Sequence, residues 1–332
     1  MTCYMHICTF PLSGWPNPEN AISSDYNSWN PLLPDPISCF NLCDHHSCSQ
    51  NKALEMSSEI LQPLNPVVRP RLDPQYKKLH DTVLQYNEPT HLKAWNPSTR
   101  QPSSTSVQTG LQPVEVLEEK VKLDDFNILV LTPQDGKPED GWPFFVWFHG
   151  GGFVYGNHSS ELDLITRICK EAGCVVFSVD YRRAPEIPFP ASNDDAITAV
   201  KWIFSDAVKR FSLQYDRWSI GGVSAGALLS VATLISLKAE SEITKPLQQI
   251  LIVPVVDNTA TPDSEAWKVK PHAIMPSPER MLWYRNLWLG KTNPDWSICL
   301  LRSLQSRRRT YSQPRELPLP SSSKMPTWRW KS

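Results

Sequence analysis

The sequence predicts an α/β protein with a mostly parallel sheet and helices on both faces. Three observations support this class. Short apolar segments such as FFVWFHG (144–150) and CVVFSVDYR (174–182) have the composition of buried strands. SNDDAITAVKWIFSDAVKRF (192–211) has the apolar spacing of a helix, and the two kinds of segment alternate between residues 114 and 299. Such alternation is typical of a parallel sheet covered on both faces.

The order of elements follows from local signals. Asp73 and Pro74 predict the N-cap and first position of a helix that extends to residue 86. Segments 114–123 and 126–133 predict a hairpin that turns at Asp124 and Asp125. The remaining predicted elements are a helix capped by Ser192 or Asn193, the strand 217–222, the helix 225–239, the strand 248–257, and the helix 278–289 that stops at Gly290.

Charge and hydropathy argue against several partners. The 33 Lys and Arg residues balance 34 Asp and Glu residues, so net charge gives no reason to expect nucleic acid or an anionic membrane. The chain has no apolar run of the ~18–20 residues that span a membrane. The N-terminus has no Lys or Arg before its apolar run, which is unlike a signal peptide. We therefore expect a cytoplasmic protein.

Both ends of the chain differ from the middle. Residues 1–55 are rich in Pro, Asn, Ser and Cys and predict a disordered extension, while Met56 has the setting of a natural start. Residues 56–299 predict one globular domain, and the basic segment 300–332 predicts a disordered tail. CFNLCDHHSC (39–48) lacks a standard zinc-ligand spacing, so we expect no metal and no cofactor.

Two glycine-rich motifs indicate acyl-transfer chemistry. Gly222-Val223-Ser224-Ala225-Gly226 matches G-x-S-x-G, in which a sharp turn between a strand and a helix exposes a nucleophilic serine. HGGGF (149–153) follows a buried strand, where backbone N–H groups can bind a developing oxyanion. We predict Ser224 as the nucleophile. The predicted oxyanion donors are Gly151, Gly152 and Ala225, and the supporting residues are His149, Gly150, Gly222 and Gly226.

A third motif completes a family pattern. With DYRRAPEIPFPASNDD (180–195) between the other two, the chain resembles the hormone-sensitive-lipase-like family of α/β-hydrolases over roughly residues 65–299. The resemblance implies the α/β-hydrolase fold, a small N-terminal helical cap over the pocket, and hydrolysis of carboxylic esters without a cofactor. Fungal members with a similar SSEILQPLNP start imply a role in secondary metabolism. Val223 stands where the family usually has Asp.

The family order places an Asp and then a His after the serine, and here that pattern gives way to the basic tail after residue 298. We expect a frameshift or missed intron to have replaced the last strands, the acid and the base. Within the chain, Asp257 and His272 are the substitutes, although the first also reads as a strand-end cap and the second as an exposed histidine. Asp194 and Asp195 are expected to cap their helix, and His158 has no orienting partner that the sequence identifies.

The sequence thus predicts a serine carboxylesterase, with the activity of this chain in question because no base follows the motifs. The alternative is a non-catalytic binding protein of the same fold, since the plant gibberellin receptor resembles the same family and lacks the triad histidine. Either function requires a small-molecule ester or carboxylate ligand. The oligomeric state is not predicted.

Overall fold

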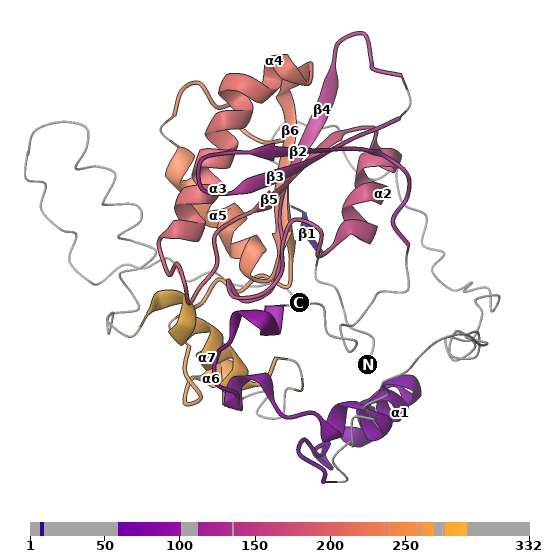
Figure 1. Ribbon diagram of the computed structural model, residues 1–332, viewed down its shortest axis with the longest axis vertical. Helices are drawn as coiled ribbons and strands as arrows, with labels where there is room; N and C mark the ends of the chain where they lie inside the picture. The colour runs from indigo at the N-terminus through magenta and orange to yellow at the C-terminus, as the bar shows by residue number, and fades with distance from the viewer. Residues whose placement is uncertain are drawn as a thin grey trace, which may run out of the picture.

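The computed structural model describes residues 7–9, 59–100, 112–134, 136–238, 240–258, 260–268, 274 and 276–290 of the 332-residue chain. The described residues form one seven-stranded sheet in the order β1-β7-β6-β4-β5-β3-β2 (Figure 1). Its strands are β1 (Ile7–Thr9), β2 (Leu117–Lys122), β3 (Asn127–Thr132), β4 (Trp142–Phe148), β5 (Val175–Asp180), β6 (Leu213–Val223) and β7 (Gln248–Ile252).

The sheet is parallel at its centre and antiparallel at its edges. Strands β5, β4, β6 and β7 run parallel, and the register aligns Phe148 with both Val179 and Gly222. The β2–β3 hairpin is antiparallel, and β3 also pairs antiparallel with β5. The register brings the ends of β4 and β6 side by side, so the two glycine-rich motifs meet at one edge of the sheet.

Helices cover the sheet and form a second layer beyond its edge. They are α1 (Pro74–Thr82), α2 (Leu162–Ala172), α3 (Ala191–Trp202), α4 (Val208–Arg210), α5 (Ala225–Leu237), α6 (Glu265–Lys268) and α7 (Pro278–Leu289). Short 3-10 turns lie at Arg69–Arg71, Leu84–Tyr86, Thr90–Leu92 and Pro97–Arg100, and a π-helical turn, Ile203–Ala207, joins α3 to α4. None of the described helices is long and apolar enough to cross a bilayer.

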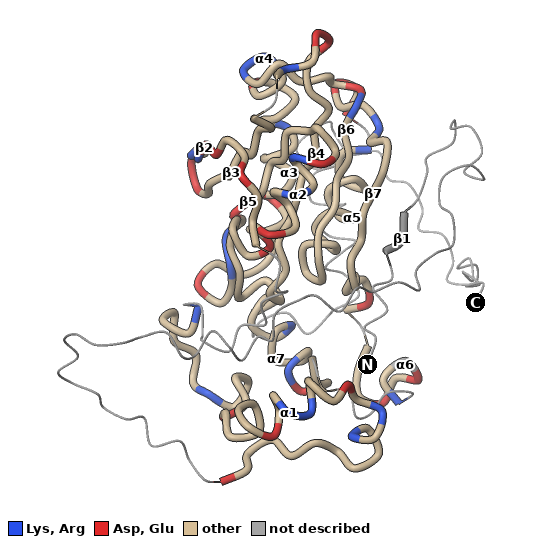
Figure 2. Tube along the Cα trace, turned by 90° about the vertical axis from the view of Figure 1, so that its right-hand side faces the viewer, with Lys and Arg blue, Asp and Glu red and all other residues tan. Residues whose placement is uncertain are grey.

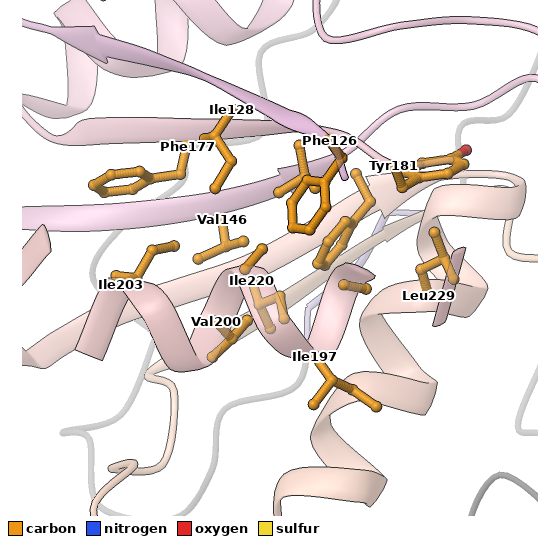
Figure 3. Packing of buried hydrophobic residues seen from close by; sticks show 14 of the residues in the cluster. Phe126, Ile128, Val146, Phe177, Tyr181, Ile197, Val200, Ile203, Ile220 and Leu229 are labelled. Carbon is orange, nitrogen blue, oxygen red and sulfur yellow. The ribbon is translucent and has the colours of Figure 1, made fainter. Parts of the chain in front are cut away.

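The core lies on both faces of the sheet. On one face, Phe126, Ile128, Val146 and Phe177 pack against α3 and α5, and the close view shows Val200 of α3 beneath these strands (Figure 3). On the other face, Ile165 and Cys169 of α2 pack against Trp147, Leu129 and Val176. Strands β4 and β5 are apolar along almost their whole length because both of their faces are buried.

Segments 59–100, 260–268 and 276–290 lie together below the sheet, although the strands of the sheet separate the first from the other two in sequence (Figure 1). Arg280 of α7 donates to the Thr90 hydroxyl across this layer at 3.2 Å. Charged residues of both signs are spread along the described chain rather than gathered by sign (Figure 2). This layer is where the resemblance placed a cap.

Several local predictions are confirmed. Asp73 caps α1 by accepting hydrogen bonds from the N–H groups of Gln75 and Tyr76, and Pro74 is the first helical residue. The hairpin turns between Lys122 and Asn127, and α7 ends at Gly290. The mixed α/β sheet is the predicted fold class.

Other local predictions are wrong. Helix α3 begins at Ala191, and its N-cap is Pro190, not Ser192 or Asn193. The side chain of Asp195 does not cap the helix, because it is buried and pairs with Arg182 at 2.7 Å. Strand β1, which pairs antiparallel with β7, was not predicted. The rest of segment 1–55, with its Cys and His cluster, lies outside the described residues, as does the basic tail 300–332.

Candidate active site

Ser224 occupies the turn between β6 and α5. Its backbone has φ 54° and ψ −112°, a conformation that L-residues adopt at a cost of roughly 1–3 kcal/mol. Two hydrogen bonds fix the turn: the Ser224 N–H donates to the carbonyl of Ile252 at 2.8 Å, and the Ser224 carbonyl accepts from Leu228 at 3.2 Å. This is the geometry of a nucleophile elbow, which aims the serine hydroxyl away from the sheet.

The glycines of the G-x-S-x-G motif leave no space for a side chain. A Cβ added at Gly226 would lie 2.0 Å from the carbonyl oxygen of Phe148, and one at Gly222 would lie 2.5 Å from backbone atoms of Gly226. These contacts involve backbone atoms, which cannot move aside as a flexible side chain can. The two glycines are therefore needed so that β4, β6 and α5 can meet at Ser224.

The second motif forms a tight loop after β4. Gly151 has φ 114°, and a Cβ there would lie 2.3 Å from the Tyr155 carbonyl oxygen. The loop is fastened at Gly150, whose N–H donates to the Glu161 carboxylate at 3.2 Å. Within the described chain the N–H groups of Gly151 and Gly152 have no acceptor. These two donors are therefore available to a ligand.

His149 is locked beneath this loop. Its ring is fully buried, stacks on Tyr181 with 4.2 Å between ring centroids, and donates from Nδ1 to the Gly150 carbonyl at 2.7 Å. Burial lowers the pKa of His149 to about 4. The imidazole is thus neutral near pH 7, and its hydrogen bond to the Gly150 carbonyl holds the backbone of the loop.

A cavity of about 220 Å³ brings the two motifs together. Ser224, Gly151, Gly152 and Ala225 all line it. Ala225 is the first residue of α5, so its N–H has no acceptor within the helix. Ser224 and the three residues predicted to supply oxyanion donors therefore line one cavity.

The predicted acid, Asp257, lies near the cavity but does not line it. Asp257 follows β7, and its Oδ1 accepts from the Ala260 N–H at 3.2 Å. Its neighbours Val255 and Asn258 line the cavity, whereas Asp257 itself does not. His272 lies outside the described residues. Among the residues that the structure describes, no histidine lines the cavity.

His158 has an orienting partner that the sequence did not identify. Its Nδ1 lies 3.2 Å from Oδ2 of Asp180, the last residue of β5. Burial by itself raises the pKa of Asp180, but the hydrogen bond with His158 and the charge of Arg183 outweigh it and hold that pKa below its usual value. The pair does not line the cavity, so it braces the loop after the oxyanion motif.

Helix α7 supplies a side of the cavity that sequence reasoning did not place. Five of its residues line the space: Arg280, Met281, Tyr284, Arg285 and Trp288. Trp288 stacks on Phe153 with 3.9 Å between ring centroids, and its Nε1–H donates to the Ser192 hydroxyl at 3.2 Å. The aromatic spacing of PERMLWYRNLWLG predicted the helix, but nothing local indicated which element it would face.

Comparison with known proteins places this chain in a family. A family model described as the alpha/beta hydrolase fold matches residues 145–313. The chain is 32% identical over 255 residues to the AB hydrolase superfamily protein C1039.03 of Schizosaccharomyces pombe, which covers 73% of this chain and 74% of that protein. It is 34% identical over 129 residues to the ethyl acetate hydrolase of Pseudomonas putida, or 39% of this chain and 40% of that protein.

A solved structure agrees on the fold. It comes from work on two fungal esterases from Rhizomucor miehei, and it matches 69% of this chain and 70% of its own with a TM-score of 0.56. The sequence identity is 22%, so this likeness concerns architecture alone.

Proposed function

Since the chain belongs to the alpha/beta hydrolase fold family, we propose that it cleaves carboxylic esters with Ser224 as the nucleophile. The family resemblance read from the motifs is confirmed, and the chain is a carboxylesterase-like hydrolase. One observation carries the proposal: Ser224 lines the same cavity as Gly151, Gly152 and Ala225, the residues whose N–H groups are the predicted oxyanion donors. The relative from Pseudomonas putida, an ethyl acetate hydrolase, supports the choice of ester as substrate.

The reaction proceeds in two steps. The Ser224 hydroxyl attacks the ester carbonyl carbon and gives its proton to a base, while the carbonyl oxygen becomes an oxyanion held by the three N–H groups. The tetrahedral intermediate expels the alcohol, which takes up the proton, and leaves an acyl-serine. Water then hydrolyses the acyl-serine, releasing the acid and restoring the hydroxyl.

Asp257 and His272 are the acid and base that this chain offers. They follow Ser224 in the order Ser, Asp, His, which is the order of triad partners in α/β-hydrolases. Asp257 also lies beside residues of the cavity lining. Replacing each separately, as Asp257→Asn and His272→Ala, tests these roles, and an unchanged rate in either variant removes that residue from the mechanism.

The cavity limits the size of the substrate. A space of about 220 Å³ matches an ester with short or medium chains rather than a long-chain glyceride. Its described lining is apolar or aromatic apart from Ser224, the predicted oxyanion donors, Asn258 and the arginines of α7. A place in secondary metabolism and a cytoplasmic location remain predictions from the sequence.

The test is hydrolysis of p-nitrophenyl acetate and butyrate by the full 332-residue chain. We expect saturable hydrolysis that falls at least about a thousandfold in Ser224→Ala, because an enzyme without its nucleophile retains only oxyanion binding. Ser205→Ala, which removes an exposed serine on the π-helical turn, is the matched control and should keep the rate. Equal rates in the Ser224→Ala and parent proteins would reject Ser224, and ester binding without turnover would favour the non-catalytic binding protein.

A further inference from the structure

The side of the cavity formed by α7 is positively charged. Arg280 and Arg285 both line the space, and no Asp or Glu lines it among the residues that the structure describes. The other α7 residues that line the cavity, Met281, Tyr284 and Trp288, are apolar or aromatic. Guanidinium groups beside a small apolar cavity need hydrogen-bond partners, because charged groups lose hydration on burial.

Arg285 is accounted for by the protein itself. Its Nη1 donates to the carbonyl oxygens of Asn258 at 2.8 Å and Ala260 at 2.6 Å. Burial lowers the pKa of Arg285, and the charge of Asp257 acts in the opposite direction. Arg285 therefore holds the loop after β7 against α7, and Asp257 offsets its charge.

Arg280 has a different environment. Its backbone N–H is taken by the Ser277 cap, and its Nη2 donates to the neutral hydroxyl of Thr90 at 3.2 Å. Within the described part of the chain, no carboxylate lies within ion-pair distance of its guanidinium. A guanidinium has five N–H donors, so one hydroxyl leaves most of them for a ligand.

The positive charge of Arg280 lowers the pKa values of two neighbours, Tyr284 and His91. Burial raises the pKa of the Tyr284 phenol, and Arg280 opposes that rise. Burial lowers the pKa of His91, and Arg280 lowers it further, against the nearby charge of Glu279. His91 is thus held toward its neutral form beside the charged Arg280.

We propose that Arg280 selects esters that carry a second, ionised carboxylate, that is, half-esters of aliphatic dicarboxylic acids. A planar guanidinium matches a carboxylate with two parallel hydrogen bonds, whereas a neutral ester group offers no charge. Apolar residues that line the same cavity as Arg280 and Ser224, such as Met281 and Trp288, suit the methylene chain that joins the two ends. Turnover of such a substrate rests on the proposed function, and water then converts the half-ester to the dicarboxylate, the alcohol and one proton.

The test measures binding without chemistry, so that it does not depend on turnover. In the Ser224→Ala background, calorimetry compares monomethyl and dimethyl esters of succinate, glutarate, adipate and pimelate. We expect at least one half-ester to bind about 10-fold or more tightly than its diester, a size typical of a charged hydrogen-bonded pair. Arg280→Met should bring that ratio to about one, and Arg280→Lys should retain part of it.

Two controls separate charge recognition from support of the fold. Arg69→Met removes an equal charge from an exposed site on the cap, where Arg69 pairs with Asp81, and it should leave the ratio unchanged. Thr90→Val removes the hydroxyl that Arg280 contacts but keeps the guanidinium charge, so it should retain most of the ratio.

The outcomes are distinct. A ratio of about one in the parent, or an equal ratio in parent and Arg280→Met, would overturn the proposal. A loss of the ratio in Thr90→Val as large as in Arg280→Met would also overturn it, because Arg280 would then act by positioning residues 90–92. Half-ester selectivity without hydrolysis by the unsubstituted chain would keep this inference and reject the esterase.

Discussion

Two sides of one cavity are built in different ways. The cavity floor, residues 149–153 and 222–226, is made of backbone held so closely that an added Cβ at Gly226 would meet a carbonyl oxygen at 2.0 Å. The cavity wall, the α7 residues Arg280, Met281, Tyr284, Arg285 and Trp288, is made of side chains. Backbone N–H groups can stabilise the charge that develops on any ester, whereas the side chains of the wall meet the parts that differ between esters.

The floor and the wall should therefore differ in the substitutions that they tolerate. The floor has almost no free volume, so adding even one carbon atom there should destabilise the protein. The wall consists of packed but replaceable side chains, and it should tolerate changes that keep volume.

Gly226→Ala should have the largest effect on folding. The new methyl would contact the carbonyl oxygens of Phe148 and His149, and we expect a loss of about 5 kcal/mol or the absence of a cooperative transition. Urea denaturation followed by circular dichroism measures it. Gly136→Ala, where no atom lies within 4 Å, is the control and should stay within about 0.5 kcal/mol. Equal stability of the two variants would contradict the packed floor.

Trp288→Ala tests the contact between wall and floor. The indole is 3% exposed and stacks on Phe153, so its removal leaves a cavity and should cost about 4 kcal/mol. Trp288→Phe keeps an aromatic ring but loses the hydrogen bond to Ser192, and should cost about 1–2 kcal/mol. The same denaturation experiment measures both. If Trp288→Ala lowered the free energy of unfolding less than Trp288→Phe does, then α7 would not support the loop.

The protein should become less stable in acid because of His149. The unfolded chain takes up a proton near the ordinary pKa of 6.5, but the folded chain does so only near a pKa of about 4. Protons thus favour the unfolded state, and the free energy of unfolding should fall by about 3 kcal/mol as the pH decreases through this range.

The difference between parent and His149→Gln isolates this effect from other groups. Denaturant titrations at intervals between pH 7 and 4 should show a smaller fall for the variant, even if its stability at pH 7 is lower. Parallel curves for the two proteins would show that His149 titrates alike in the folded and unfolded chains.

Met281→Leu should have the smallest effect. Both side chains are flexible or branched apolar groups of similar volume, so the wall should lose less than about 1.5 kcal/mol. Hydrolysis of p-nitrophenyl acetate should change little, while the preference among longer acyl chains should shift. A loss of stability near that of Trp288→Ala would mean that the wall is as constrained as the floor.

The contrast also explains what the sequence could predict. The residues of the floor can be named from the sequence, because G-x-S-x-G and HGGGF are local motifs with defined strand and loop settings. The wall was not, since the approach of α7 to Ser224 depends on contacts such as that of Trp288 with Phe153, which are 135 positions apart in the chain.

The same limit applies to charged residues. Asp195 resembles a capping residue in sequence, yet its partner Arg182 lies on the loop after β5, and this contact exists only in the folded protein. His158 and Asp180 likewise form a pair across 22 residues. Arg280 is a candidate ligand-binding residue because it lines the cavity, and its position in the sequence does not show this.

The most direct test of the central claim is covalent labelling of Ser224. The full-length chain is incubated with a neutral alkyl fluorophosphonate, and the labelled peptide is identified by mass spectrometry. The account predicts one phosphonyl group, located on Ser224 and absent from the Ser224→Ala protein. A label on another residue, or none on a chain that binds esters in this cavity, would contradict it.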